Sequence, residues 1–178
     1  TTVLDSTIFV DDDGSMYMYY SGVRNGQYIA GVKLNSPYEA DYSTQRDLVF
    51  AGALSTTNTE LKLEWERYRG GPIVEAPYMI KSNGKYYLTY SANHTRSEDY
   101  AIGYAISESP MGPFKKYVNN PILHKTEEVN GTGHHSFFHT LEENNLVCVY
   151  HSHFSKTQFQ PRLICIDKAG FEKSDNGD

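Results

Sequence analysis

Three polar residues stand at the heads of otherwise apolar, tyrosine-rich segments of this 178-residue chain. Glu75 opens EAPYMIKSNGKYYLTYSA, Asp5 opens DSTIFVDDDGSMYMYYSG, and His134 opens HHSFFHTLEENNLVCVYHSH. A charge in such a place is either a solvated strand end or a group directed into a site. If the two carboxyl groups share a site, Asp5 raises the pKa of Glu75, because both cannot ionise cheaply together. These residue types therefore point to acid–base chemistry.

The segments behind these heads repeat. Asp5 precedes Gly14 by nine residues, and Glu75 precedes Gly84 by nine. A tyrosine follows each acid by fifteen residues, and in a looser third copy a tyrosine follows His134 by sixteen. Each segment has the short Tyr, Ile, Val and Phe runs of a strand pair, and the glycines can supply the positive φ of a hairpin turn.

The repeat predicts an all-β fold. Helical periodicity is nearly absent, and repeats of about 60 residues with roughly four strands each are typical of β-propeller blades. We expect one domain over residues 1–178, with blades at about 1–70, 71–128 and 129–178. Since the innermost strands of a propeller converge on its axis, the three polar heads should meet at one end of the channel.

Composition excludes two classes of protein. The net charge is −6, from 16 basic and 22 acidic residues, which argues against nucleic acid as a partner. No apolar run approaches the roughly 20 residues of a membrane span. The chain starts at Thr1 without Met, so the lack of a visible signal peptide says little. Cys148 and Cys165 are predicted to be buried thiols, with a bridge between neighbouring strands as the alternative.

The chain resembles glycoside hydrolase family 43, whose members are five-bladed propellers. The strongest match is the segment from Glu75 to Ala92 followed by YAIGYAISESPMGPFKKYVNNPIL. LDSTIFVDDDGSMYMYYSG resembles the preceding blade, GTGHHSFF resembles the glycine–histidine element of the family, and PRLICIDKAGFEKSDNG resembles its arginine-bearing segment. The resemblance covers nearly the whole chain and follows the order of the family.

The resemblance implies a role for each matched residue. Glu75 would be the general acid that protonates the leaving glycosidic oxygen, and Asp5 the second carboxylate that tunes and orients it. His134 would be the axial histidine near a calcium or other ion, and Arg162 would face the sugar. No cofactor is needed for the chemistry, which in an inverting glycosidase is performed by two carboxyl groups and a water.

The match is incomplete. The family places its catalytic base on an Asp in the blade before the one that holds Asp5, and the chain begins four residues before Asp5. It resembles the middle three of five blades, so we expect poor or no activity from the chain alone. Open strand edges would favour a homo-oligomer or a complementing chain. Asp11, Asp12 and Asp13 are predicted to be turn residues and not the missing base.

Alternatives remain for several residues. Trp65 and Tyr78 are candidate sugar-binding aromatics, although such residues more often pack blades together. The cluster of histidines between residues 124 and 153 raises the possibility of a zinc-dependent hydrolase, but neighbours in a strand point to opposite faces and cannot all bind one ion.

The sequence predicts an inverting hydrolase of arabinofuranosides or xylosides in plant cell-wall polysaccharide. The alternative is a carbohydrate-binding propeller remnant without catalysis. Because the expected partner is an oligosaccharide or polysaccharide outside the cell, a secreted or periplasmic location is expected.

Overall fold

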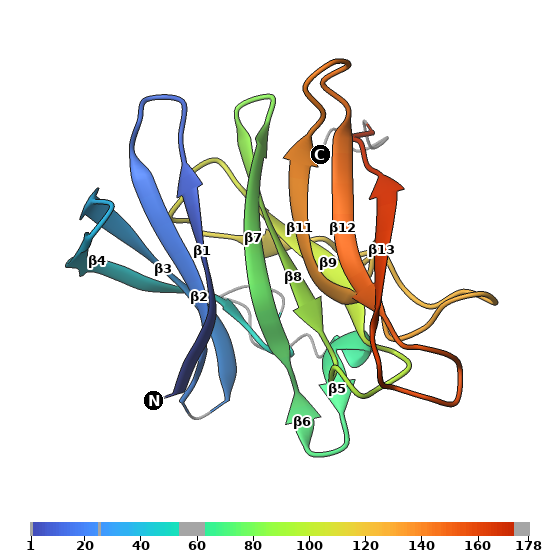
Figure 1. Cartoon of the computed structure of the whole chain (residues 1–178). Coiled ribbons are helices and arrows are strands. Elements are labelled where there is room, and N and C mark those ends of the chain that lie inside the picture. The colour runs from blue at the N-terminus through green and yellow to red at the C-terminus, as the bar shows by residue number, and fades with distance from the viewer. Residues whose placement is uncertain (1, 25, 54–62, 173–178) are drawn as a thin grey trace.

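The computed structural model describes residues 2–24, 26–53 and 63–172, and its described part is almost entirely β-structure (Figure 1). The elements, in chain order, are β1 (Thr2–Val10), β2 (Met16–Val23), β3 (Gln27–Ser36), β4 (Glu39–Phe50), the short 3-10 helix η1 (Glu64–Glu66), β5 (Arg67–Tyr68), β6 (Gly71–Pro72), β7 (Val74–Ser82), β8 (Lys85–Ala92), β9 (Ala101–Ser107), β10 (Lys115–Lys116), β11 (Gly133–His139), β12 (Leu146–Ser152) and β13 (Leu163–Lys168). The predicted all-β class is confirmed.

The strands form three antiparallel sheets that lie side by side (Figure 1). Their orders are β1-β2-β3-β4, β10-β9-β8-β7 and β11-β12-β13, and β5 and β6 form a separate two-stranded ribbon. The first strands of the three sheets are neighbours, because β7 contacts both β1 and β11. This is the radial arrangement of propeller blades. The third blade has three strands within the described residues, where four were expected.

The hairpin turns adopt the predicted geometry. Gly14 has φ +81° and donates its N–H to the carbonyl of Asp11 at 2.9 Å. Asn83 and Gly84 have φ +50° and +77°, the pair of positive values that a two-residue type I′ hairpin turn requires. The prediction that residues 11–13 form a turn is confirmed. Asp11 also accepts a hydrogen bond from the Tyr86 hydroxyl at 2.6 Å, which ties this turn to the next blade.

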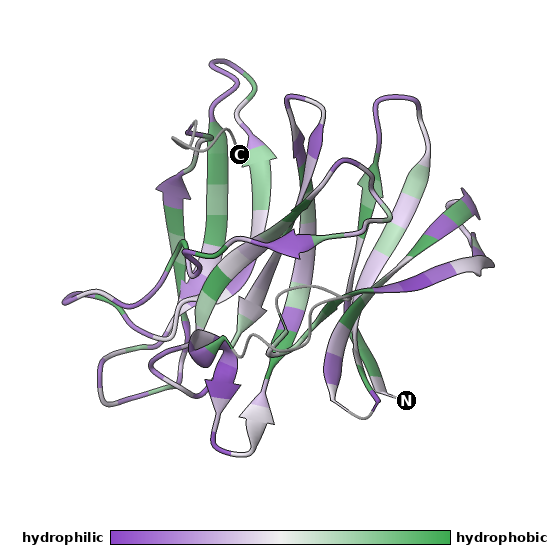
Figure 2. Ribbon diagram, turned by 180° about the vertical axis from the view of Figure 1, so that it is seen from behind, coloured by the Kyte–Doolittle hydropathy of each residue, from purple (hydrophilic) through white to green (hydrophobic). Residues whose placement is uncertain are grey.

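The core lies between the blades. The largest buried cluster joins the first two sheets and includes Tyr19, Leu48, Val74, Leu88 and Tyr90. Hydrophobic residues lie mainly along the strands, and hydrophilic residues are frequent in the loops (Figure 2). Burying one large side chain of this kind stabilises the fold by about 1.5–3 kcal/mol. Contacts between neighbouring blades therefore fix where each inner strand begins.

A smaller cluster joins the second and third sheets through Ile102, Cys148 and Tyr150. Cys148 and Cys165 are both free, so the alternative of a bridge is wrong. Cys148 is buried as predicted, whereas Cys165 is partly exposed. Within the described part of the chain, no helix has the length and apolarity to cross a membrane.

Candidate active site

A β-bulge near the start of each inner strand shapes the candidate site. The pairing register shifts between Leu4 and Thr7 in β1, between Glu75 and Tyr78 in β7, and between Gly133 and Ser136 in β11. Bulges of this kind redirect side chains and are common beside active sites. The same local distortion therefore recurs at the heads of three successive blades.

Each bulge contains a residue other than glycine with a positive φ. These residues are Asp5 at +56°, Ala76 at +50° and His134 at +49°. Left-handed backbone at such residues costs energy and is found preferentially at functional sites. By register, Ala76 is the equivalent of Asp5 and His134, and Glu75 lies one residue earlier. The strict equivalence of Asp5, Glu75 and His134 expected from sequence spacing is therefore off by one residue in β7.

Two buried serines hold the bulges against the preceding blade. Ser21 Oγ in β2 accepts the backbone N–H of Ala76 at 3.1 Å, and Ser91 Oγ in β8 accepts that of His134 at 2.8 Å. The two serines are equivalent in register and are 3% and 0% exposed. A bulge frees a backbone N–H from the strand ladder, so a buried acceptor is needed to satisfy it.

Glu75 is a partly buried carboxyl group with one hydrogen-bond donor among the described residues. The Tyr100 hydroxyl donates to Glu75 Oε1 at 2.7 Å. Burial raises the pKa of Glu75, the Tyr100 hydrogen bond opposes this, and the charge of Asp5 raises it further. A carboxyl group with a raised pKa holds its proton to higher pH than an ordinary carboxyl group, which suits a general acid.

Asp5 and His134 lie near enough to Glu75 to act on its charge. Asp5 raises the pKa of Glu75, and His134 and His94 lower it. Asp5 is half-buried at the head of β1, and His134 is exposed at the head of β11. The three inner strands thus bring together the two carboxyl groups and the imidazole that the sequence singled out.

Arg162 reaches the same region through a histidine. One of its guanidinium nitrogens lies 3.4 Å from Nδ1 of His151. The His151 ring stacks on that of Tyr100, with centroids 5.6 Å apart and planes at 17°. Burial, followed by the neighbouring Arg162, lowers the pKa of His151 to about 4, so this imidazole is neutral at physiological pH. Arg162 is exposed just before β13.

The two aromatic candidates are engaged within the protein. Trp65 packs against the main core cluster, its ring 5.6 Å from that of Tyr90. Tyr78 donates its hydroxyl to the carbonyl of Phe137 at 2.6 Å across the interface between blades. Both residues are partly exposed, and both contribute to the packing between elements, so their role in sugar binding stays a prediction.

The described residues were compared with the ligand sets that hold metal ions in proteins. Across the described ranges, no three or more His, Cys, Asp or Glu side chains are grouped to hold one. His135, next to His134, is turned inward and its Nε2 lies 2.7 Å from Thr89 Oγ1. Burial lowers its pKa to about 3. The axial ion near His134 stays a prediction, and no chemical step below depends on it.

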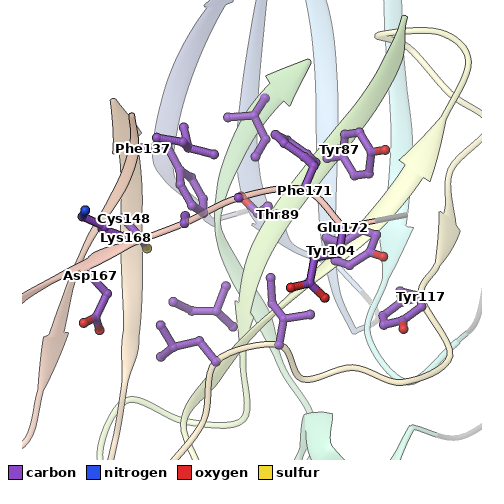
Figure 3. A pocket seen from close by; sticks show the side chains of 17 residues that line it. Tyr87, Thr89, Tyr104, Tyr117, Phe137, Cys148, Asp167, Lys168, Phe171 and Glu172 are labelled. Atoms are coloured by element: carbon purple, nitrogen blue, oxygen red, sulfur yellow. The ribbon is translucent and has the colours of Figure 1, made fainter. Parts of the chain in front are cut away.

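A pocket of about 700 Å³ lies elsewhere, between the second and third blades (Figure 3). Tyr87, Tyr104, Tyr117 and Phe171 line one part of it, and Cys148 lies in another. Its lining does not include Asp5, Glu75 or His134. The candidate active site is therefore a cluster at the heads of the inner strands and is separate from this pocket.

The fold is that of β-propeller blades, with two carboxyl groups near the heads of neighbouring inner strands. Residues 1–175 match the family description "Glycosyl hydrolases family 43". The chain belongs to this family.

Individual solved structures and curated relatives are also similar to this chain. An endo-1,4-beta-xylanase structure from Bacteroides thetaiotaomicron superimposes with a TM-score of 0.84 at 32% identity, covering 99% of this chain and 57% of that one. A beta-D-galactofuranosidase, xynD, of Aspergillus niger is 28% identical over 96% of this chain and 44% of its own length. The xylosidase/arabinosidase 43A of Humicola insolens is 32% identical over 62% and 40%. The chain thus spans about half the length of these proteins, and its fold is part of a five-bladed propeller.

Sequence reasoning missed Tyr100 and the two serines, and it considered His151 only as a member of the histidine cluster. Tyr100 is one of 15 tyrosines, and it contacts Glu75 across 25 positions. Ser21 and Ser91 carry a weak signal, because each directly follows the tyrosine that marks the repeat. That spacing could have shown that the two serines are equivalent, although not what they bind.

Proposed function

We propose that this protein hydrolyses arabinofuranosides or xylosides of plant cell-wall polysaccharide, with Glu75 as the general acid. The observation that carries the proposal is a partly buried Glu75 whose pKa is raised by burial and by Asp5. The names of the relatives support this substrate class, since they include a xylosidase/arabinosidase and a beta-D-galactofuranosidase. Their common chemistry is the cleavage of a glycosidic bond.

In the proposed reaction Glu75 gives its proton to the leaving glycosidic oxygen as the bond to the sugar breaks. Burial, and in addition the nearby Asp5, raise the pKa of Glu75 and so favour its protonated form before the transfer. An inverting mechanism also requires a carboxylate that activates water on the opposite face of the sugar. We expect that base in a blade before Asp5, because Asp11 and Asp12 are engaged by Lys81 at the far end of the hairpin.

The test uses aryl α-L-arabinofuranosides, β-D-xylosides and β-D-galactofuranosides with the wild-type protein, Glu75→Gln, and the exposed control Glu142→Gln. We expect Glu75→Gln to lose about 10²–10⁴-fold in kcat, with the control unchanged. The loss should be greatest for substrates with poor leaving groups, because a good leaving group departs without a proton. Equal rates for Glu75→Gln and wild type on a poor leaving group would disprove the role of Glu75.

A second candidate function is carbohydrate binding without catalysis. It is favoured by the positions of Asp11 and Asp12 in the turn, which leave no base beside Asp5 and Glu75 among the described residues. Calorimetric binding of arabinoxylan oligosaccharides by a chain with no turnover would support it. Turnover abolished by Glu75→Gln would exclude it. A secreted or periplasmic location remains a prediction under both functions.

We further propose that another polypeptide surface covers the two outer faces of this chain, supplied by a second copy or a complementing chain. On β1, Ile8 and Val10 are 57% and 59% exposed, and on β13, Ile164 and Ile166 are 81% and 64% exposed. Such faces favour association. Sedimentation of the isolated chain should show concentration-dependent self-association that Ile164→Lys reduces. A monomer at all concentrations would contradict this.

A further inference from the structure

Tyr100 is the closest partner of Glu75 and is completely buried. It comes from the loop between β8 and β9, is 0% exposed, and donates its hydroxyl to Glu75 Oε1 at 2.7 Å. A buried phenol in this setting has a fixed role as donor, because burial and the neighbouring Glu75 charge raise the pKa of Tyr100 well above its ordinary value. The hydroxyl therefore stays protonated throughout the working pH range.

The third blade provides a cradle for the Tyr100 ring. Gly133 and His151 are directly paired across β11 and β12, so their side chains would lie on the same face. A Cβ added to Gly133 would come within 2.2 Å of the Tyr100 ring, which shows that the ring occupies the space left by the missing side chain. The His151 ring stacks on Tyr100 at 5.6 Å and 17°.

The equivalent pairs in the other blades differ. They are Leu4 with Ser21 in the first blade and Glu75 with Ser91 in the second, and neither contains a glycine. Of these three pairs, the one in the third blade contains a glycine, and this is the blade that packs against the Tyr100 ring. Tyr100 itself belongs to the second blade, so its ring crosses the interface that Glu75 faces.

The hydrogen bond has a chemical consequence for Glu75. Oε1 accepts from Tyr100 and is a poor place for a proton, since the phenol hydrogen already points at it. A neutral Glu75 therefore carries its proton on Oε2. Once that proton leaves, the Tyr100 hydroxyl stabilises the resulting carboxylate, because hydrogen bonds to a charged acceptor are stronger than those to a neutral one.

We propose that Tyr100, seated between Gly133 and His151, is the positioning residue of the general acid: it occupies Oε1 of Glu75 and makes Oε2 the oxygen that delivers the proton. The proposal rests on the proposed function only where it calls Glu75 a general acid. The contact itself, and the control it exerts over the proton of Glu75, exist whether or not the chain turns over substrate.

Other charged groups also face Glu75. Asp5 from β1 favours its protonated form, and His134 from β11 and His94 from the loop after β8 favour its ionised form. The Tyr100 hydroxyl also interacts with Ser91, whose Oγ accepts the backbone N–H of His134. Tyr100→Phe removes both contacts of the hydroxyl, whereas a ring substituent that keeps the hydroxyl changes only its strength as a donor.

The test is a pH titration of the glutamate carboxyl carbons of the whole chain by ¹³C NMR, with the Glu75 signal assigned from Glu75→Gln. We expect the pKa of Glu75 to rise in Tyr100→Phe, since the lost hydrogen bond favours the ionised form. The matched control is Tyr90→Phe, which removes a buried phenol that donates to a different carboxylate, Glu66. It should leave the Glu75 titration unchanged.

Three further variants test how the Tyr100 ring is held and guard against a misfolded mutant. His151→Ala should shift the Glu75 titration in the same direction as Tyr100→Phe, whereas His151→Phe, which preserves a flat ring, should not. Replacement of Tyr100 by 3-fluorotyrosine, a nearly isosteric and stronger donor, should lower the pKa of Glu75. An unchanged Glu75 titration in both Tyr100 variants would overturn the proposal.

Kinetic measurements of hydrolysis test the proposal independently of the titration. In protein that turns over an aryl glycoside, Tyr100→Phe should move the alkaline limb of kcat/KM to higher pH and reduce kcat by roughly tenfold to a hundredfold, the equivalent of one hydrogen bond to a charged group. An altered Glu75 titration with no hydrolysis by any variant would uphold the positioning role and count against the hydrolase function.

Discussion

Glu66 and Glu75 are nine residues apart on the chain, and each accepts a hydrogen bond from a buried tyrosine. Tyr90 donates to Glu66 at 2.9 Å, and Tyr100 donates to Glu75 at 2.7 Å. Their remaining surroundings differ. Glu66 is fully buried and is held by the Lys116 ammonium at 2.7 and 2.8 Å, whereas Glu75 is partly exposed and faces the carboxyl group of Asp5.

Glu66 is also bonded by the backbone N–H of Gly52 at 2.6 Å. Burial raises the pKa of both acids, but Lys116 opposes the effect at Glu66 while Asp5 adds to it at Glu75. A carboxylate surrounded by donors and a cation is a structural tie between blades. A carboxyl group with one donor and an acidic neighbour can lose and regain a proton. The neighbours, and not the residue type, separate structure from chemistry.

The largest loss of stability should follow from removing the ion pair between Glu66 and Lys116. In Glu66→Gln the Lys116 ammonium stays buried without its counter-charge, which typically costs 3–5 kcal/mol. The free energy of unfolding, measured in urea, should fall by about that amount, and Glu75→Gln should change it far less. The double replacement Glu66→Leu with Lys116→Met should recover much of the loss. Equal destabilisation by Glu66→Gln and Glu75→Gln would contradict the comparison.

A smaller effect should separate the two tyrosines. Tyr90→Phe removes a donor from a completely buried carboxyl group that is paired with Lys116, so we expect a loss of about 1.5–3 kcal/mol. Tyr100→Phe acts on a carboxyl group that is partly exposed, and we expect about 0.5–1.5 kcal/mol. Thermal and urea unfolding of the two variants, measured side by side, give the order. If Tyr100→Phe lost more stability than Tyr90→Phe, the hydrogen bond to Glu75 would contribute more to folding than the one to Glu66, which would contradict the comparison.

The smallest effect concerns the pH dependence of stability. Because the pKa of Glu75 is raised in the folded state, the folded chain binds more protons than the unfolded chain between the two pKa values. Stability from this group is complete below its unfolded pKa and is lost as pH rises through the folded value. The difference in unfolding free energy between wild type and Glu75→Gln should decline over that window. A difference in unfolding free energy that does not change with pH would show that folding does not shift the pKa of Glu75.

The sequence indicated the main features of the fold because they depend on local signals. Tyrosine-rich strand pairs with Gly14 and Gly84 at their turns predicted hairpins, and the repetition of these hairpins predicted blades. The position of Glu75 at a strand head was predicted too. The register of β7 was not predicted, because the hairpin from Glu75 to its partner Ser91 is one residue shorter than the hairpin from Leu4 to its partner Ser21. Glu75 therefore lies one position ahead of the residues equivalent to Asp5 and His134.

By itself, the sequence determined which elements form and which three polar residues head the inner strands, since turn chemistry and strand periodicity act over a few residues. The tertiary structure decided what surrounds each acid. Lys116 meets Glu66 from 50 positions away and Tyr100 meets Glu75 from 25, and these distances are closed by blade packing. Charge, burial and hydrogen bonding at a carboxyl group depend on such neighbours, so its proton affinity is set by the fold.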